Sequence, residues 1–389
     1  MAENVRSSSG SSAQRPRFRY PLARPRLGER ERTYLLEAFD SGWISSAGEF
    51  ILRFQREFSS YVGTRHGVAT SNGTTAIHLA LAASGVGAGD EVIVPDLTFV
   101  SPANMVLQTG AKPVLADSNK DYWGIDADAI KVKLTDRTKA VIVVHLYGHP
   151  VDLDPIVELC NSRNLVLIED CAEAHGAMYK GRRVGSFGQI SCFSFYGNKL
   201  LTTGEGGMCL TNDPMLEERM KLLRDHGADR KQHFWHPAVG FNYRMTNLQA
   251  AIGCAQLESL DERIEKYRMI GRAYASRLVE TFGSSVTPHP EMRWALCVFW
   301  MYTLLIDSLD PIKRERLRSH LAEEGIETRP IFYPISKLPP YRGEPRVSDN
   351  PNAASISSRG ISLPTYEGLE RPDIDVIVDT LHELVASRL

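Results

Sequence analysis

The chain alternates short apolar runs with longer stretches of helical periodicity. Between residues 91 and 170 the apolar runs are continuous in Val, Ile and Leu, which is typical of strands buried on both faces. Strands are predicted at His66–Ala69, Glu91–Pro95, Pro113–Asp117, Ala140–His145, Leu165–Asp170, Gln189–Ser194 and Gly207–Leu210. Helices are predicted between several of them, at Ala76–Ala83, Val100–Gly110, Asp126–Leu134 and Asp152–Asn161. This strand–helix–strand repetition predicts an α/β fold with a mostly parallel sheet covered by helices.

The pattern differs on either side of this repetition. Further helices are predicted at Arg30–Asp40, Glu49–Tyr61 and Asp373–Ser387, and a long helical region is predicted from about Thr246 to about Thr281. An apolar strand at Ala295–Ile306 opens a smaller α+β lobe, and the segment Ser336–Asn352, rich in Pro, Arg and Asn, is predicted to be a loop over the surface. We therefore expect a disordered N-terminal arm at 1–19, a large domain at 20–265 and a small C-terminal domain at 266–389.

Composition agrees with two lobes and excludes several classes of protein. The 389 residues exceed the size at which a single core usually stops growing. The formal net charge is -2 and the chain has no long Lys/Arg tract. A basic surface that would bind nucleic acid or an anionic membrane is therefore not expected. The chain also lacks a run of about 18 apolar residues, so no membrane span is expected.

The N-terminus and the cysteines indicate a cytoplasmic protein without a metal site. The segment Met1–Arg19 is rich in Ser and Arg and lacks the apolar segment that a secretory signal needs. The six cysteines are scattered without a CxxC pair, so neither a zinc site nor a disulfide framework fits their spacing. A reducing cytoplasm is the simplest setting for them.

The segment Thr70–Thr75 follows a predicted strand and opens a helix. Its sequence, Thr-Ser-Asn-Gly-Thr-Thr, places Gly and hydroxyl side chains beside the free backbone amides of a helix start, an arrangement that binds anions. The same residues also suit an ordinary helix cap. The segment alone leaves both interpretations open.

Asp170 closes the apolar run that begins at Leu165. A carboxylate at the carboxyl end of a buried strand lies where open α/β sheets bind ligands. Such an Asp could pair with a protonated pyridine nitrogen and keep the ring cationic, so that the ring accepts electrons. A helix-capping Asp is the simpler interpretation of this residue alone.

Lys199 follows an apolar strand and the sequence Ser-Phe-Tyr-Gly-Asn, and it precedes the Gly-rich turn Thr202–Gly207. A Lys in a partly dry pocket can lose its proton and attack an aldehyde, whereas most lysines are simply on the surface. The turn is not a dinucleotide fingerprint, because a strand and not a helix follows it. The later segment Gly240–Asn247 reads, by itself, as a polar loop and helix start.

Together these segments resemble the DegT/DnrJ/EryC1/StrS family of pyridoxal-phosphate (PLP)-dependent sugar aminotransferases, from about Tyr20 onward. The matching elements are Trp43–Ser46, Asn72–Thr74, Pro95–Phe99, Glu169–Gly176, Ser194–Lys199 and Gly240–Asn247. Within the family, the Trp-Ile-Ser-Ser loop, the Ala-Glu-Ala-His stretch and the Asn242 segment look most like those of GDP-perosamine synthases. The resemblance implies a PLP-transferase type I fold, similar to that of aspartate aminotransferase.

The resemblance implies catalytic roles for two residues and a special role for a third. Lys199 would hold pyridoxal 5'-phosphate as a Schiff base and later move a proton between cofactor and substrate carbon. Asp170 would form a salt bridge with the pyridine nitrogen. Glu173 stands where Gln is common in the family and would contact the ring hydroxyl, which raises the question of its protonation state.

The remaining implied contacts surround the cofactor and the substrate. Gly73, Thr74 and Ser194 would hold the phosphate, Phe99 would stack on the pyridine face, and Asn242 would reach in from a second subunit. Trp43, His175 and Arg329 are candidates for substrate contact. His175 suits a structural core histidine equally well, and Arg329 suits an ordinary surface arginine.

The implied reaction moves an amino group from glutamate to a keto sugar, most of all a nucleotide-linked 4-keto-6-deoxyhexose, for surface polysaccharide or related amino-sugar synthesis. A homodimer with shared sites is expected. Alternatives are a different acceptor, such as a keto-octulosonate or a cyclitol, a PLP sugar 3-dehydratase, or a non-catalytic regulator on the same fold. In the dehydratase branch His typically replaces the Schiff-base Lys, so Lys199 favours amino transfer.

Overall fold

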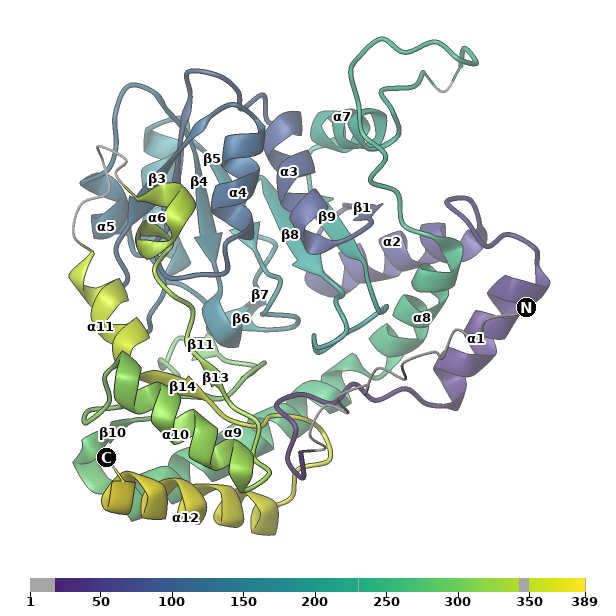
Figure 1. Ribbon diagram of the computed structural model, residues 1–389. Coiled ribbons are helices and arrows are strands. Elements are labelled where there is room, and N and C mark those ends of the chain that lie inside the picture. The colour runs from purple at the N-terminus through teal and green to yellow at the C-terminus, as the bar shows by residue number, and fades with distance from the viewer. Residues whose placement is uncertain (1–17, 230, 343–349, 389) are drawn as a thin grey trace, which may run out of the picture.

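The computed structural model describes residues 18–229, 231–342 and 350–388. The predicted arm at 1–19 lies almost entirely outside the described residues. Within them, the fold consists of a large sheet with helices on both faces and a second, smaller lobe below it (Figure 1).

The large sheet has seven strands in the order β1-β9-β8-β5-β4-β2-β3. They are β1 (His66–Thr70), β2 (Glu91–Pro95), β3 (Lys112–Ala116), β4 (Thr138–Val144), β5 (Val166–Asp170), β8 (Ile190–Ser194) and β9 (Gly207–Thr211). All neighbouring pairs from β8 to β3 are parallel, and β9 runs antiparallel to both β1 and β8. The predicted mostly parallel sheet is therefore confirmed, and each predicted strand lies within two residues of its observed bounds.

Helices cover both faces of this sheet because its strands are apolar on both faces. On β2, Val92 and Val94 belong to one buried cluster and Ile93 to another. The first cluster is closed by α3 (Gly73–Ala83), α4 (Ser101–Gln108) and α7 (Pro214–Arg224). The second is closed by α2 (Glu49–Val62), α5 (Ala127–Lys131), α6 (Leu153–Ser162) and α8 (Asn247–Glu258), and α1 (Glu29–Asp40) packs on α8.

The second lobe is built on an antiparallel sheet in the order β10-β12-β14-β13. Its strands are β10 (Val286–Thr287), β12 (Thr303–Ile306), β13 (Arg329–Pro330) and β14 (Gly360–Ser362). Its helices are α9 (Leu260–Phe282), α10 (Pro311–Glu323), α11 (Pro351–Arg359) and α12 (Arg371–Arg388). A small sheet of β6 (Met178–Tyr179), β7 (Arg182–Arg183) and β11 (Ala295–Leu296) completes the strands of the described residues.

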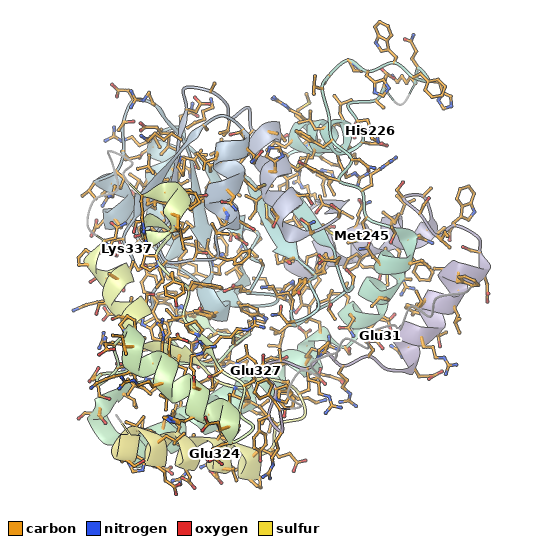
Figure 2. All side chains as sticks on the ribbon, viewed as in Figure 1. Glu31, His226, Met245, Glu324, Glu327 and Lys337 are labelled. Carbon is orange, nitrogen blue, oxygen red and sulfur yellow. The ribbon has the colours of Figure 1, made fainter. Side chains whose placement is uncertain are left out.

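The N-terminal segment packs on the second lobe before the chain enters the first. The Tyr20 N–H donates to the Gly325 carbonyl (3.0 Å), and the Leu22 N–H donates to the carboxylate of Glu327 (2.9 Å), which Figure 2 labels in that lobe. The predicted boundary between the two domains, at 265/266, falls inside helix α9. The division of the chain at this position stays a prediction.

Two sequence predictions in the second half of the chain were wrong in part, and a third, the long helical region, is confirmed and resolved into two helices. The helical region Thr246–Thr281 is two helices, α8 and α9, separated at Ser259. The strand Ala295–Ile306 is two short strands in different sheets, because Phe299 has a positive φ of 48° that interrupts extended backbone. The segment Ser336–Asn352 is not a simple surface loop.

That segment has buried residues at both of its described ends. It contains two 3-10 turns, η3 (Ile335–Lys337) and η4 (Pro339–Tyr341), and the side chains of Ser336, Tyr341 and Asn350 are buried. The reason is the buried carboxylate of Asp96, which accepts hydrogen bonds from Ser336 and Asn350. Two further 3-10 turns, η1 (Leu146–Gly148) and η2 (Gly283–Ser285), follow β4 and α9.

The described part of the chain contains no helix with both the length and the apolar character that a bilayer crossing requires. All six cysteines are buried and unpaired, and a buried free Cys behaves as a small apolar residue.

Candidate active site

A cavity of about 560 Å³ opens beside the carboxyl ends of β5 and β8, where the second lobe meets the large sheet. Eight of the eleven residues singled out in the sequence line it, although they are spread over more than 250 positions. They are Gly73, Thr74, Phe99, Asp170, Glu173, Ser194, Lys199 and Arg329. Trp43, His175 and Asn242 do not line it.

One end of the cavity is the N-terminus of α3. The side chain of Asn72 caps this helix by accepting a hydrogen bond from the Thr75 N–H (2.9 Å). The cap leaves the N–H groups of the first helical residues, Gly73 and Thr74, without partners inside the helix. Cap and anion site are therefore compatible interpretations of the same segment, because different residues fulfil them.

Gly73 is required for the approach of α3 to β8. A Cβ atom on Gly73 would lie 2.6 Å from the Ser194 Cβ, which is closer than real side-chain contacts allow. The Thr74 hydroxyl lies 2.8 Å from the hydroxyl of Ser101. The result is a group of hydroxyls and free amides with positive helix-dipole potential, suited to a phosphate dianion.

Asp170 lies at the carboxyl end of β5 and is buried. One of its carboxylate oxygens accepts a hydrogen bond from the Ala172 N–H (3.0 Å). Burial raises the pKa of Asp170 above its ordinary value, and the nearby Lys199 counteracts that shift. A cationic ring nitrogen at this carboxylate would offset the cost of burying its charge.

Lys199 projects into the cavity from the turn after β8. Its side chain is only 11% exposed, and Nζ lies 3.9 Å from a carboxylate oxygen of Glu173. Burial lowers the pKa of the Lys199 amine, while Glu173 and Asp170 favour its charged form. The turn is closely packed, since a Cβ on Gly206 would lie 2.7 Å from the end of Met245, labelled in Figure 2.

Glu173 is held from the opposite side. Its second carboxylate oxygen accepts a hydrogen bond from the Tyr147 N–H (2.7 Å), and burial raises the pKa of Glu173 to about 7. This acidic residue therefore places an ionisable group, rather than an amide, beside the Lys199 amine. Its protonation changes near neutral pH.

The outer wall of the cavity consists of Phe99, Arg329 and Phe332. The rings of Phe99 and Phe332 lie 5.9 Å apart, and Arg329 belongs to β13 of the second lobe. Sequence reasoning missed Phe332, together with Trp300, which also lines the cavity. Both lie in apolar stretches, so no residue pattern distinguishes them from core residues.

The three remaining candidates lie elsewhere. His175 is fully buried among Phe58, Phe193 and Phe195, and burial lowers its pKa to about 3, which agrees with the structural interpretation of this residue. Trp43 is 62% exposed on the loop between α1 and α2.

Asn242 is exposed, and its side-chain amide oxygen accepts a hydrogen bond from the Arg244 guanidinium (3.0 Å). It forms an isolated antiparallel bridge with Asp225, which directly follows α7. The chain between α7 and α8 extends away from the body of the fold (Figure 1).

A buried group of His145, Glu169 and Cys171 has donor atoms close enough to hold a metal ion. However, the Glu169 carboxylate is already occupied by the N–H groups of Gly185, Phe187 and Gly188. The His145 Nε2 lies 3.2 Å from that carboxylate, which identifies the group as a buried hydrogen-bond network. No other metal-ligating group was found among the described residues.

Comparison with known proteins agrees with this geometry. Residues 25–382 match the DegT/DnrJ/EryC1/StrS aminotransferase family. The chain belongs to this family. The resemblance inferred from the sequence is therefore confirmed, and the protein is a PLP-dependent aminotransferase with the PLP-transferase fold.

Individual relatives of this family are similar over nearly the full chain. GDP-perosamine synthase of Caulobacter vibrioides is 45% identical over 94% of this chain and 98% of its own length. GDP-perosamine synthase of Escherichia coli O157:H7 is 43% identical over 95% and 99%. The crystal structure of S. venezuelae DesV, in complex with a ketimine intermediate, has a TM-score of 0.85 at 34% identity and covers 93% of this chain and 95% of its own.

Proposed function

We propose that the protein transfers an amino group from glutamate to a keto sugar, specifically a nucleotide-linked 4-keto-6-deoxyhexose, as a GDP-perosamine synthase would. The main support is the position of the Lys199 amine, nearly buried between Asp170, Glu173 and the start of α3. The similarity to GDP-perosamine synthases over more than nine tenths of the chain supports the choice of acceptor.

The residues of the cavity fit pyridoxal phosphate. When bound, the cofactor supplies an aldehyde to which amines add and a cationic ring that accepts electrons from a breaking C–H bond. Gly73, Thr74 and Ser194 would hold the phosphate, and Phe99 would cover one ring face. Asp170 would keep the ring nitrogen protonated, since a buried carboxylate stabilises an adjacent cation.

Lys199 would act first as the covalent anchor of the cofactor and then as the base that moves the proton. Burial lowers the pKa of this amine and so favours the uncharged form that attacks an aldehyde, and the same Nζ would then accept a proton from the substrate carbon. Glu173 would orient that amine and contact the ring hydroxyl. Arg329, on the outer wall, would bind the carboxylate of glutamate or the phosphates of the acceptor.

A homodimer with shared sites completes the proposal. Asn242 lies outside the cavity of its own chain, so its implied cofactor contact needs a second subunit. The loop between α7 and α8 also exposes large apolar side chains, with Phe234 90% and Val239 91% exposed. Surfaces of this kind are typical of protein interfaces. We place the dimer in the cytoplasm, where its six free thiols stay reduced.

Two measurements test the proposal. Borohydride reduction of the purified protein followed by peptide mapping should place the reduced cofactor on Lys199; an adduct on another lysine, or none, would refute the assignment. Incubation with glutamate and a panel of keto nucleotide sugars, keto-octulosonates and cyclitol ketones should give an aminated GDP-hexose by mass spectrometry. Amination of another acceptor instead would refute the specific substrate and retain the reaction.

A further inference from the structure

Trp300 contacts Lys199 in two ways. The Lys199 Nζ lies 3.5 Å from the centroid of the indole ring, and the indole N–H donates to the carbonyl of Asn198 (2.8 Å). Trp300 therefore contacts both the amine and the backbone immediately before Lys199. An ammonium over an indole face is attracted by the ring quadrupole, and this attraction increases when the pair is desolvated.

The indole cannot easily turn away from this position. Trp300 is 5% exposed, and its ring stacks on Tyr147 with a centroid distance of 6.1 Å and an interplanar angle of 14°. The Tyr147 ring in turn stacks on Phe332. Because the Tyr147 N–H also holds Glu173, the Lys199 amine lies between a fixed indole face and a fixed carboxylate.

We propose that Trp300 is a positioning residue that holds the Lys199 side chain at the reaction site whenever its amine is protonated and not joined to the cofactor. This inference rests on the proposed role of Lys199. In amino transfer the Lys199 amine is released once the amino donor has taken its place, and it must then stay close to the reacting carbon. The indole face gives the charged amine a partner inside the cavity, so that it does not turn to solvent.

The contribution of Trp300 differs from those of the other groups that face Lys199. Asp170 and Glu173 favour the ammonium, Arg329 opposes it, and His175 stays neutral. The attraction of Glu173 depends on its own protonation near neutral pH, whereas the indole does not titrate. The attraction of Trp300 for the ammonium therefore does not depend on the protonation state of Glu173.

The test uses the apoprotein, so that it reports on the free amine. Trace acetylation at a series of pH values, followed by quantitative peptide mass spectrometry, gives the titration midpoint of Lys199. In Trp300→Leu we expect this midpoint to fall by about one unit, the size of a desolvated cation–π contact. Trp300→Phe keeps a ring face and should shift it less. Trp294→Leu, a half-buried Trp that does not line the cavity, is the matched control and should leave it unchanged.

A midpoint of Lys199 that stays constant or rises in folded Trp300→Leu would overturn the inference. If that variant does not fold, Trp300→Phe decides, and an unchanged midpoint there overturns it as well. The labelling does not involve the cofactor. Failure of the Trp300 inference is thus separate from failure of the proposed function, which would appear as a borohydride adduct away from Lys199.

Discussion

The two sides of the cavity differ in how the fold holds them. The cofactor side, formed by Gly73, Thr74, Asp170, Ser194 and Lys199, comes from strand ends and turns of one sheet and is largely buried. The outer wall, formed by Phe99, Arg329 and Phe332, combines both lobes, and Phe99 is 53% exposed. Under the proposed roles, the reaction chemistry would be held by the sheet, whereas the choice of substrate would depend on contacts between distant segments.

Those distant contacts are few and specific. The Phe332 N–H donates to the hydroxyl of Tyr147 (3.1 Å), and the Asp96 carboxylate accepts from the Ser336 N–H (2.7 Å), the Ser336 hydroxyl (2.7 Å) and the Asn350 amide (2.9 Å). Asp96 directly follows β2, so these bonds link the large sheet to the segment after the outer wall. Substitutions on the two sides should consequently have different kinetic signatures.

The largest effect is expected on the cofactor side from Lys199→Ala. Loss of both the covalent anchor and the base should abolish turnover, while circular dichroism stays that of the folded protein. Lys131→Ala, an exposed Lys on α5, is the control and should retain full activity. Substantial transamination by Lys199→Ala would break the assignment of the chemistry to this side.

Asp170→Asn should have the next largest effect. An amide cannot hold the ring nitrogen in its cationic form, so kcat should fall about 100- to 1000-fold, the cost of losing a buried electrostatic stabiliser. The KM for the acceptor should change little, because the outer wall is intact. Steady-state kinetics of the variant measures kcat and KM separately. Asp128→Asn, at an exposed Asp on α5, is the control. A dominant effect on acceptor KM would erase the distinction between the two sides.

The same distinction explains what the sequence could predict. Strand ends can be located from continuous apolar runs, and Asp170, Ser194 and Lys199 are each placed by such a run. The outer wall depends on chain segments that meet only after folding. Asp96, for example, hydrogen-bonds a residue 240 positions away.

Sequence patterns also gave wrong predictions where the backbone conformation of a single residue determines the local structure. The positive φ of Phe299 interrupts an apolar run that looks like one strand, and it leaves Trp300 in the cavity instead of in a sheet. His175 shows the opposite case, because a polar residue in a matching motif lies among three Phe rings of the core.

Asp96→Asn should affect the outer wall with a smaller, different signature. The amide cannot accept all three hydrogen bonds, so the segment after Phe332 should be held less firmly. We expect the KM for the acceptor to rise about tenfold, corresponding to one net hydrogen bond to a charged group, with kcat nearly unchanged. Asp117→Asn is the matched control, since Asp117 caps α11 in the same region without contacting η3. A loss confined to kcat would contradict the separation of the two sides.

The smallest effect is expected from Glu173→Gln, and it depends on pH. Because burial raises the pKa of Glu173 from its ordinary value to about 7, the folded apoprotein binds a proton more tightly than the unfolded chain does. Below the pKa of the unfolded chain the carboxyl is neutral in both the folded and the unfolded state. The stability that tighter proton binding gives the folded state is present there and is lost as the pH rises toward 7. The Gln variant lacks this loss. The difference in unfolding midpoint between the Gln variant and the unmodified protein should therefore increase by a few degrees from pH 5 to pH 7, at about 2 °C per kcal/mol. Above pH 7 the difference should stay constant. A difference that is flat across pH 5–7 would mean that Glu173 stays ionised throughout, with the Lys199 ammonium as its permanent partner.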